Sequence, residues 1–62
     1  MKLKVNDRIK IKDRNKILTI TKITMDKKTV IAHLIDGDGN LFHYQLKDLQ
    51  MSVNCNCQVI KL

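Results

Sequence analysis

The stretch TVIAHLIDGDGNLFHYQL has two runs of alternating side chains on either side of DGDGN, which contains the only two glycines of the chain. Alternation with a period of two is typical of strands, and a short glycine-containing loop between two such runs predicts an antiparallel hairpin. If residues 37–39 form the loop, with Gly39 left-handed, Asp36 pairs with Asn40 and paired residue numbers sum to 76. This register predicts a core face of Val30, Ala32, Leu34, Phe42, Tyr44 and Leu46, and an opposite face of Ile31, His33, Ile35, Leu41, His43 and Gln45.

The first half of the chain contains two further strand patterns. From Lys2 to Lys12, cationic and polar residues alternate with mainly apolar ones, so one face of this strand is a row of cations. The run from Lys16 to Met25 is rich in β-branched residues, which also favour a strand. Its apolar positions change parity after Ile20, so we expect a β-bulge near residues 21–22 that resets the inward face.

The last third of the chain has two shorter patterns. The segment LKDLQM, residues 46–51, resembles the short 3₁₀ turn that precedes the last strand of small barrels. In SVNCNCQVIKL, one parity is shared by Val53, Cys55, Cys57 and Val59. This pattern predicts a half-buried closing strand in which both thiols act as small apolar side chains of the core.

Five predicted strands without a helical period indicate an all-β chain: one small five-stranded antiparallel barrel over residues 1–62, with a short 3₁₀ turn before its last strand. This succession of elements resembles the SH3-like barrel superfold, which includes KOW and Tudor-like modules. The segments that carry the resemblance are the strand NDRIKIK, the hairpin ITKITMDKKTVIAHLI, the strand and turn LFHYQLKDLQM and the closing strand. The resemblance is architectural and implies that the last strand pairs with the first. The chain lacks the aromatic groove of peptide-binding SH3 domains, so recognition of proline-rich peptides is not implied.

Charge is distributed unevenly along the chain. Residues 1–28 hold ten Lys or Arg and three Asp, a balance of +7, whereas residues 29–62 hold two Lys and three Asp, a balance of −1. A strongly basic surface attracts phosphate groups or acidic protein surfaces. No run approaches the roughly 18 apolar residues needed to span a membrane, and the N-terminus MKLKVNDR lacks the apolar stretch of a signal peptide. We therefore expect a cytoplasmic protein with reduced thiols and no membrane contact.

Catalytic and calcium-binding patterns are weak in this sequence. An EF-hand loop that began at Asp36 would place Leu41 where glycine is required and Lys47 where the final glutamate is required, so DGDGN is interpreted as a turn. Ser52 is the only serine, and all six carboxylate side chains are Asp, most of them in predicted turns. No spacing pairs one of them with a histidine, so we expect no enzyme, no cofactor and no small-molecule substrate.

His33 and His43 lie directly opposite each other in the predicted hairpin, and a cross-strand His pair can hold a metal ion. With Cys55 and Cys57 they supply the ligand types of a zinc site. The spacing C-x-C is tighter than usual for such sites, and the closing strand is expected to lie away from the hairpin, so we expect no metal. A disulfide between the two cysteines is also disfavoured, because residues i and i+2 of a strand lie about 7 Å apart at Cα.

The basic stripe is the first functional hypothesis. Cations repeat along one face of the first strand and continue in the adjoining turns: Lys4, Arg8, Lys10, Lys12, Arg14, Lys16, Lys22, Lys27 and Lys28. Such a surface can follow a phosphate backbone. Because the register directs both Phe42 and Tyr44 to the core, no aromatic platform is expected, and binding to nucleic acid should be weakly selective and strongly dependent on salt.

The rival hypothesis is a protein-interaction module. On the predicted outer face of the hairpin, Ile31, Ile35 and Leu41 lie beside His33 and His43. Such an apolar patch is large for a 62-residue domain, which buries only about 60% of its chain surface and has marginal stability. A homodimer, or docking on another protein, would cover the patch. By analogy, very short basic barrels are the kind of product that phages and mobile elements encode to inhibit a host protein.

Overall fold

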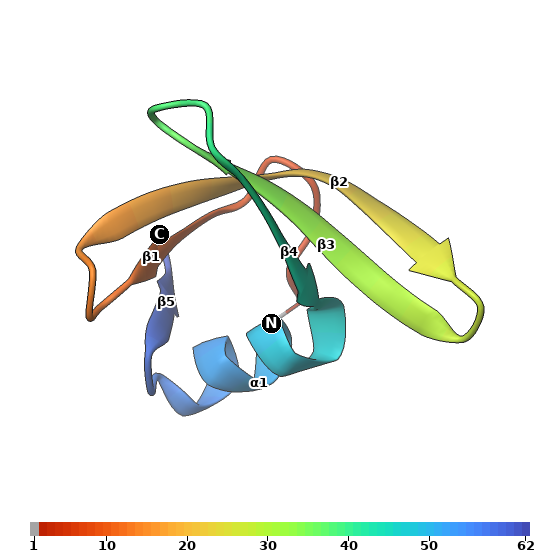
Figure 1. The fold of residues 1–62 in the computed structure, drawn as a ribbon. Helices are drawn as coiled ribbons and strands as arrows, with labels where there is room; N and C mark the ends of the chain where they lie inside the picture. The colour runs from red at the N-terminus through yellow and green to blue at the C-terminus, as the bar shows by residue number, and fades with distance from the viewer. Residues whose placement is uncertain (1) are drawn as a thin grey trace.

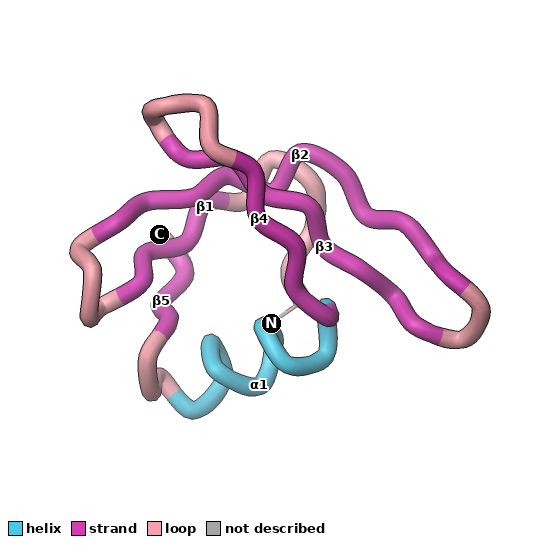
Figure 2. Tube along the Cα trace, viewed as in Figure 1, coloured by secondary structure: helices cyan, strands magenta, loops and turns pink. Residues whose placement is uncertain are grey.

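The strands form one antiparallel sheet in the order β4-β3-β2-β1-β5 (Figures 1 and 2). The computed structural model describes residues 2–62. Its elements are β1 (Arg8–Ile11), β2 (Lys16–Asp26), β3 (Thr29–Asp36), β4 (Leu41–Gln45), α1 (Leu46–Cys55) and β5 (Val59–Lys61). The predicted all-β class with five antiparallel strands is confirmed. The sheet is open rather than closed into a barrel, because β4 and β5 remain its two edges, and it is compatible with a small β-barrel-like fold.

The predicted hairpin register is confirmed. Strands β3 and β4 pair His33 with His43 and Leu34 with Phe42, as the sum of 76 requires. The Asp36 N–H donates to the Asn40 carbonyl at 3.1 Å, and Gly39 has a φ of 87°, which is the left-handed conformation that glycine adopts readily. A glycine in the loop therefore fixes which side chains of two strands face the core.

The β2–β3 pairing contains the predicted bulge. Ile20 pairs with Leu34 and Lys22 pairs with His33, so Thr21 is the extra residue. The Thr21 hydroxyl donates to the His33 carbonyl at 3.2 Å. Because of the extra residue, Ile20 before the bulge and Ile23 after it both lie on the core side of the sheet.

The core lies between one face of the sheet and helix α1. Ile9, Leu18, Ile20 and Leu34 are completely buried, and Leu49 of α1 covers them. Each such aliphatic side chain contributes roughly 1.5–3 kcal/mol through its removal from water. Figure 1 shows α1 beneath the curved sheet, and this helix contacts β3, β4 and β5.

The C-terminal third differs from the prediction. The expected 3₁₀ turn is an α-helix of 10 residues, because Leu46, Leu49 and Val53 recur at helical spacing and pack on the core together. The helix ends at Asn56, whose φ of 57° is left-handed. The Asn56 N–H donates to Val53 and the Cys57 N–H donates to Ser52, which is the pattern of a Schellman cap.

The closing strand is consequently shorter than predicted. Only Val59–Lys61 form β5, whereas Val53 and Cys55 belong to α1. The implied pairing of the last strand with the first is confirmed, since Val59 pairs with Ile11 and Ile60 pairs with Lys10. The period-2 pattern that suggested a longer strand arose by coincidence in a helical segment.

The first strand is also shorter than the alternation predicted. Lys4 to Asp7 form a turn, in which the Lys4 N–H donates to the Asp7 carboxylate at 2.9 Å and Asn6 has a φ of 79°. Leu3, before the turn, is nevertheless buried in the core. The regular alternation of exposed cations and buried aliphatic residues therefore begins at Arg8.

Candidate functional site

Strand alternation defines a second face of the sheet, which points away from α1 and is called the outer face below. Ile9, Leu18, Leu34 and Ala32 are buried on the inner side, so their strand neighbours point outward. The outer face consists of Arg8, Lys10, Ile17, Thr19, Lys22, Thr24, Asp26, Thr29, Ile31, His33, Ile35, Leu41, His43, Gln45 and Ile60.

The outer face brings together two groups of residues that the sequence assigned to rival surfaces. Arg8 pairs with Thr19, Thr19 with Ile35, and Ile35 with Leu41, so one cross-strand row runs from a cation to the exposed end of the apolar patch. Strands lie about 4.8 Å apart, so this row spans roughly 14 Å. The basic stripe and the predicted protein interface are therefore parts of one surface.

The apolar members of the outer face are unequally exposed. Leu41 is 69% exposed and Ile17 is 46% exposed, whereas Ile31 and Ile35 are half-buried. The sequence prediction did not include Ile17, although its position beside the buried Leu18 in an alternating strand was a usable signal. Tyr44, which was predicted to be in the core, is 39% exposed because its strand β4 is an edge of the sheet.

The nine predicted cationic residues are distributed over five parts of the structure. Arg8, Lys10 and Lys22 are on the outer face; Arg14 and Lys12 are in the β1–β2 turn. The others are outside this group: Lys4 is in the turn before β1, Lys27 and Lys28 are in the β2–β3 turn, and Lys16 is on the inner face.

Two of the predicted cations have partners within the protein. The Lys12 ammonium donates to the Asn56 carbonyl at 2.7 Å, where the C-terminal end of α1 favours a positive charge. Lys16 lies 3.3 Å from the Asp36 carboxylate and 5.3 Å from the centre of the Phe42 ring. Both side chains are thus used in holding the fold, and the candidate surface rests mainly on Arg8, Lys10 and Lys22.

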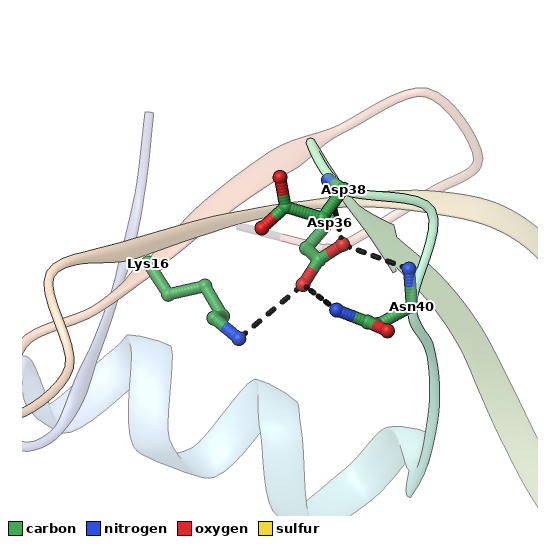
Figure 3. Close-up of polar contacts among 4 residues, drawn as sticks. All are labelled: Lys16, Asp36, Asp38 and Asn40. Carbon is green, nitrogen blue, oxygen red and sulfur yellow. Dashed lines mark hydrogen bonds and ion pairs between the residues drawn. The ribbon is translucent and has the colours of Figure 1, made fainter.

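The carboxylate of Asp36 is the centre of a buried polar network (Figure 3). Its oxygens accept hydrogen bonds from the N–H of Asp38 at 2.9 Å, from the N–H of Asn40 at 2.8 Å and from the Asn40 side-chain amide at 3.0 Å, in addition to the Lys16 contact. The Asn40 side-chain hydrogen bond, followed by the backbone N–H groups and Lys16, lowers the pKa of Asp36 from 3.8 to about 2 despite the opposing effect of desolvation. DGDGN is therefore a hairpin turn, and its first carboxylate is committed to internal donors.

The two histidines form a contact on the outer face. Their ring centres are 4.8 Å apart and the rings are nearly perpendicular. The His33 Nε2 lies 2.7 Å from the Thr24 hydroxyl. Desolvation, and then the positive Lys22 and the neighbouring His43, lower the pKa of His33 below 6.5. Within residues 2–62, no group of three or more His, Cys, Asp or Glu is arranged to hold a metal ion.

The cysteines correct two predictions. Cys55 and Cys57 form a disulfide, whereas reduced thiols were expected, and both residues are exposed rather than part of the core. The prediction assumed an extended strand, in which the two Cα atoms would lie too far apart. The helix end and the left-handed Asn56 shorten the Cα–Cα distance to 5.2 Å, which is within the usual range for a disulfide.

Comparison of the chain with protein-family models, with curated proteins and with solved structures gave no match. Across residues 2–62, no helix has both the length and the apolar character needed to cross a membrane. The geometry and charge of the outer face are therefore the features that indicate a function.

Proposed function

We propose that this chain is a non-catalytic binding module of the SH3-like barrel superfold, with a KOW or Tudor-like architecture, which binds the phosphate backbone of nucleic acid. The observation that carries the proposal is that, within residues 2–62, no ion pair joins the outward cations Arg8, Lys10 and Lys22 to a carboxylate. Of the two Asp residues within the strands, Asp36 points inward, and Asp26 is on the outer face but at the far end of the β2–β3 hairpin. Arg8, Lys10 and Lys22 therefore face solvent without a neighbouring carboxylate from their own sheet.

This arrangement supports binding through charge rather than through base recognition. Lys and Arg that replace condensed counterions on a duplex give an affinity that falls with salt, by a log-log slope of about −0.9 per phosphate contacted. The chain as a whole carries a net charge of +6, which also accelerates encounters with a polyanion. We expect low sequence selectivity, a cytoplasmic location and no cofactor.

A salt titration with a charge-reversal variant tests this function. Affinity for a generic duplex and a generic single strand is measured at several salt concentrations for the wild type, for Arg8→Glu/Lys10→Glu, and for the control Lys47→Glu. Lys47 is an exposed residue of α1, away from the outer face. The double reversal should weaken binding about tenfold or more and flatten the salt slope, because each lost contact is worth about 1 kcal/mol in water. Equal effects of both variants would contradict a site on the outer face.

The exposed apolar part of the same face favours one alternative function. Leu41, Ile31 and Ile35, beside His33 and His43, could pack against a second copy in a homodimer or against a host protein that a phage-type inhibitor blocks. The cations of the same face suit a partner with an acidic surface. Light scattering in the same experiment separates these outcomes. A dimer mass together with no binding to nucleic acid at low salt would move the proposal to this alternative.

A further inference from the structure

One end of the outer face is hollowed into a shallow depression of about 480 Å³. Its floor includes Ile17, Thr19 and Ile35, and two turns flank it: the β1–β2 turn with Arg14 and the β3–β4 turn with Asp38. Figure 1 shows both turns at the same end of the sheet. Ligand-binding clefts in proteins typically have volumes of about 300–1,000 Å³. The depression is thus large enough for one nucleotide and too small for a duplex.

Both arginines of the chain line this depression. Arg8 enters it from β1 and Arg14 from the β1–β2 turn, and both side chains are exposed. Within residues 2–62, neither guanidinium makes a hydrogen bond or an ion pair, whereas Lys12 and Lys16 are both engaged. An arginine fork matches two phosphate oxygens and also stacks on planar rings, which a lysine ammonium does not do.

The two carboxylates at this end influence where an anion can be placed. Asp36 already accepts from three N–H donors and from Lys16, so its charge is compensated inside the protein. Asp38 is exposed in the β3–β4 turn and repels phosphate on that side. An anionic group is therefore directed toward the arginines, and the apolar floor between Ile17 and Ile35 remains for an uncharged planar group.

We propose that this depression is a subsite for one unstacked nucleotide of a single-stranded nucleic acid. Arg8 and Arg14 hold its phosphate, and Ile17 and Ile35 contact the face of its base. The inference rests on the proposed function and makes it more specific, because a base reaches the floor only when it is not paired and stacked in a duplex. Apolar contact between these isoleucine side chains and the base takes the place of the aromatic stacking that single-strand binders commonly use.

The test uses variants that keep the charge constant. Fluorescence anisotropy measures the affinity for a 12-nucleotide single strand and for a duplex of equal length, with the wild type, with Arg8→Lys/Arg14→Lys and with Ile17→Ala. The control Lys2→Arg/Lys47→Arg makes the opposite exchange at two exposed lysines near α1, away from the outer face. Circular dichroism confirms that each variant is folded.

We expect the arginine variant and Ile17→Ala each to weaken single-strand binding about fivefold, which is near the lower end of the effect of removing an aromatic side chain on which a base stacks. Duplex binding should change less than twofold, and the control should leave both affinities unchanged. Equal losses on single strand and duplex would overturn the subsite, because the arginines would then act only as two of many charges.

Two further outcomes separate the subsite from the proposed function. Unchanged binding by all variants, with a steep salt dependence, would remove the subsite and leave backbone binding in place. No wild-type binding to either nucleic acid at low salt would remove both. A poly-glutamate peptide that binds with the same dependence on Arg8 and Arg14 would overturn the nucleotide subsite and reassign the depression to an acidic protein partner.

Discussion

The inner and outer faces of the sheet differ in whether their charged side chains are compensated within the protein. On the inner face, the carboxylate of Asp36 is buried and compensated by three N–H donors and Lys16. On the outer face, Arg8 and Lys22 are exposed cations, and the residues paired with them, Thr19 and His33, are not acidic. Residues that stabilise the fold therefore alternate along the same strands with residues of the proposed binding surface. Of two substitutions one residue apart, one should affect stability and the other should affect binding.

Substitutions of the adjacent residues Leu18 and Ile17 should give the largest difference in the free energy of unfolding. Leu18 is completely buried, so Leu18→Ala should lower the free energy of unfolding by about 2–5 kcal/mol. Small domains have only about 3–5 kcal/mol from their core, so most of this variant should be unfolded. Ile17 is 46% exposed, and Ile17→Ala should cost less than about 1 kcal/mol. Urea denaturation measures both, and similar losses would contradict the division between the faces.

Acid unfolding tests the compensated charge on the inner face. Because the folded state lowers the pKa of Asp36 from 3.8 to about 2, its contribution to stability is complete above pH 3.8 and is lost as the pH falls toward 2. The melting temperature of Asp36→Asn should be lower than that of the wild type at pH 7 and should fall less between pH 4 and pH 2. The exposed Asp38→Asn is the control and should keep the wild-type profile. A wild-type acid profile for Asp36→Asn would show that the network does not stabilise the charge.

The sheet could be predicted because its signals are local. Alternation around Gly39 fixed the β3–β4 register, and the change of parity after Ile20 located the bulge at Thr21. In both cases one residue with a special backbone role determined the direction of many side chains. The position of the cations Arg8 and Lys10 on one face followed from the same alternation.

The C-terminal region could not be predicted in the same way because its two periods overlap. A strand pattern is formed by Val53, Cys55, Cys57 and Val59, and a helix pattern is formed by Leu46, Leu49 and Val53. The segment is helical because the side chains of the second set pack against the inner face of the sheet. The disulfide followed from that choice, since the cysteines come close only at the helix end. The meeting of the cations and the apolar patch on one face required the pairing of β1 with β2, which is a long-range property of the sheet.

The titration of His33 gives the smallest expected effect and examines the outer face directly. Desolvation, Lys22 and His43, in that order, lower the pKa of His33, so the unfolded chain binds its proton more tightly than the folded protein does. The contribution of His33 to stability should therefore be largest above pH 6.5 and should decrease as the pH falls through the lowered pKa. In an NMR titration, Lys22→Gln should raise the His33 pKa more than His43→Gln does, while the ring remains close to Thr24. A pKa of 6.5 for His33 in the wild type would show that water solvates this part of the outer face fully, and neither substitution would then move it.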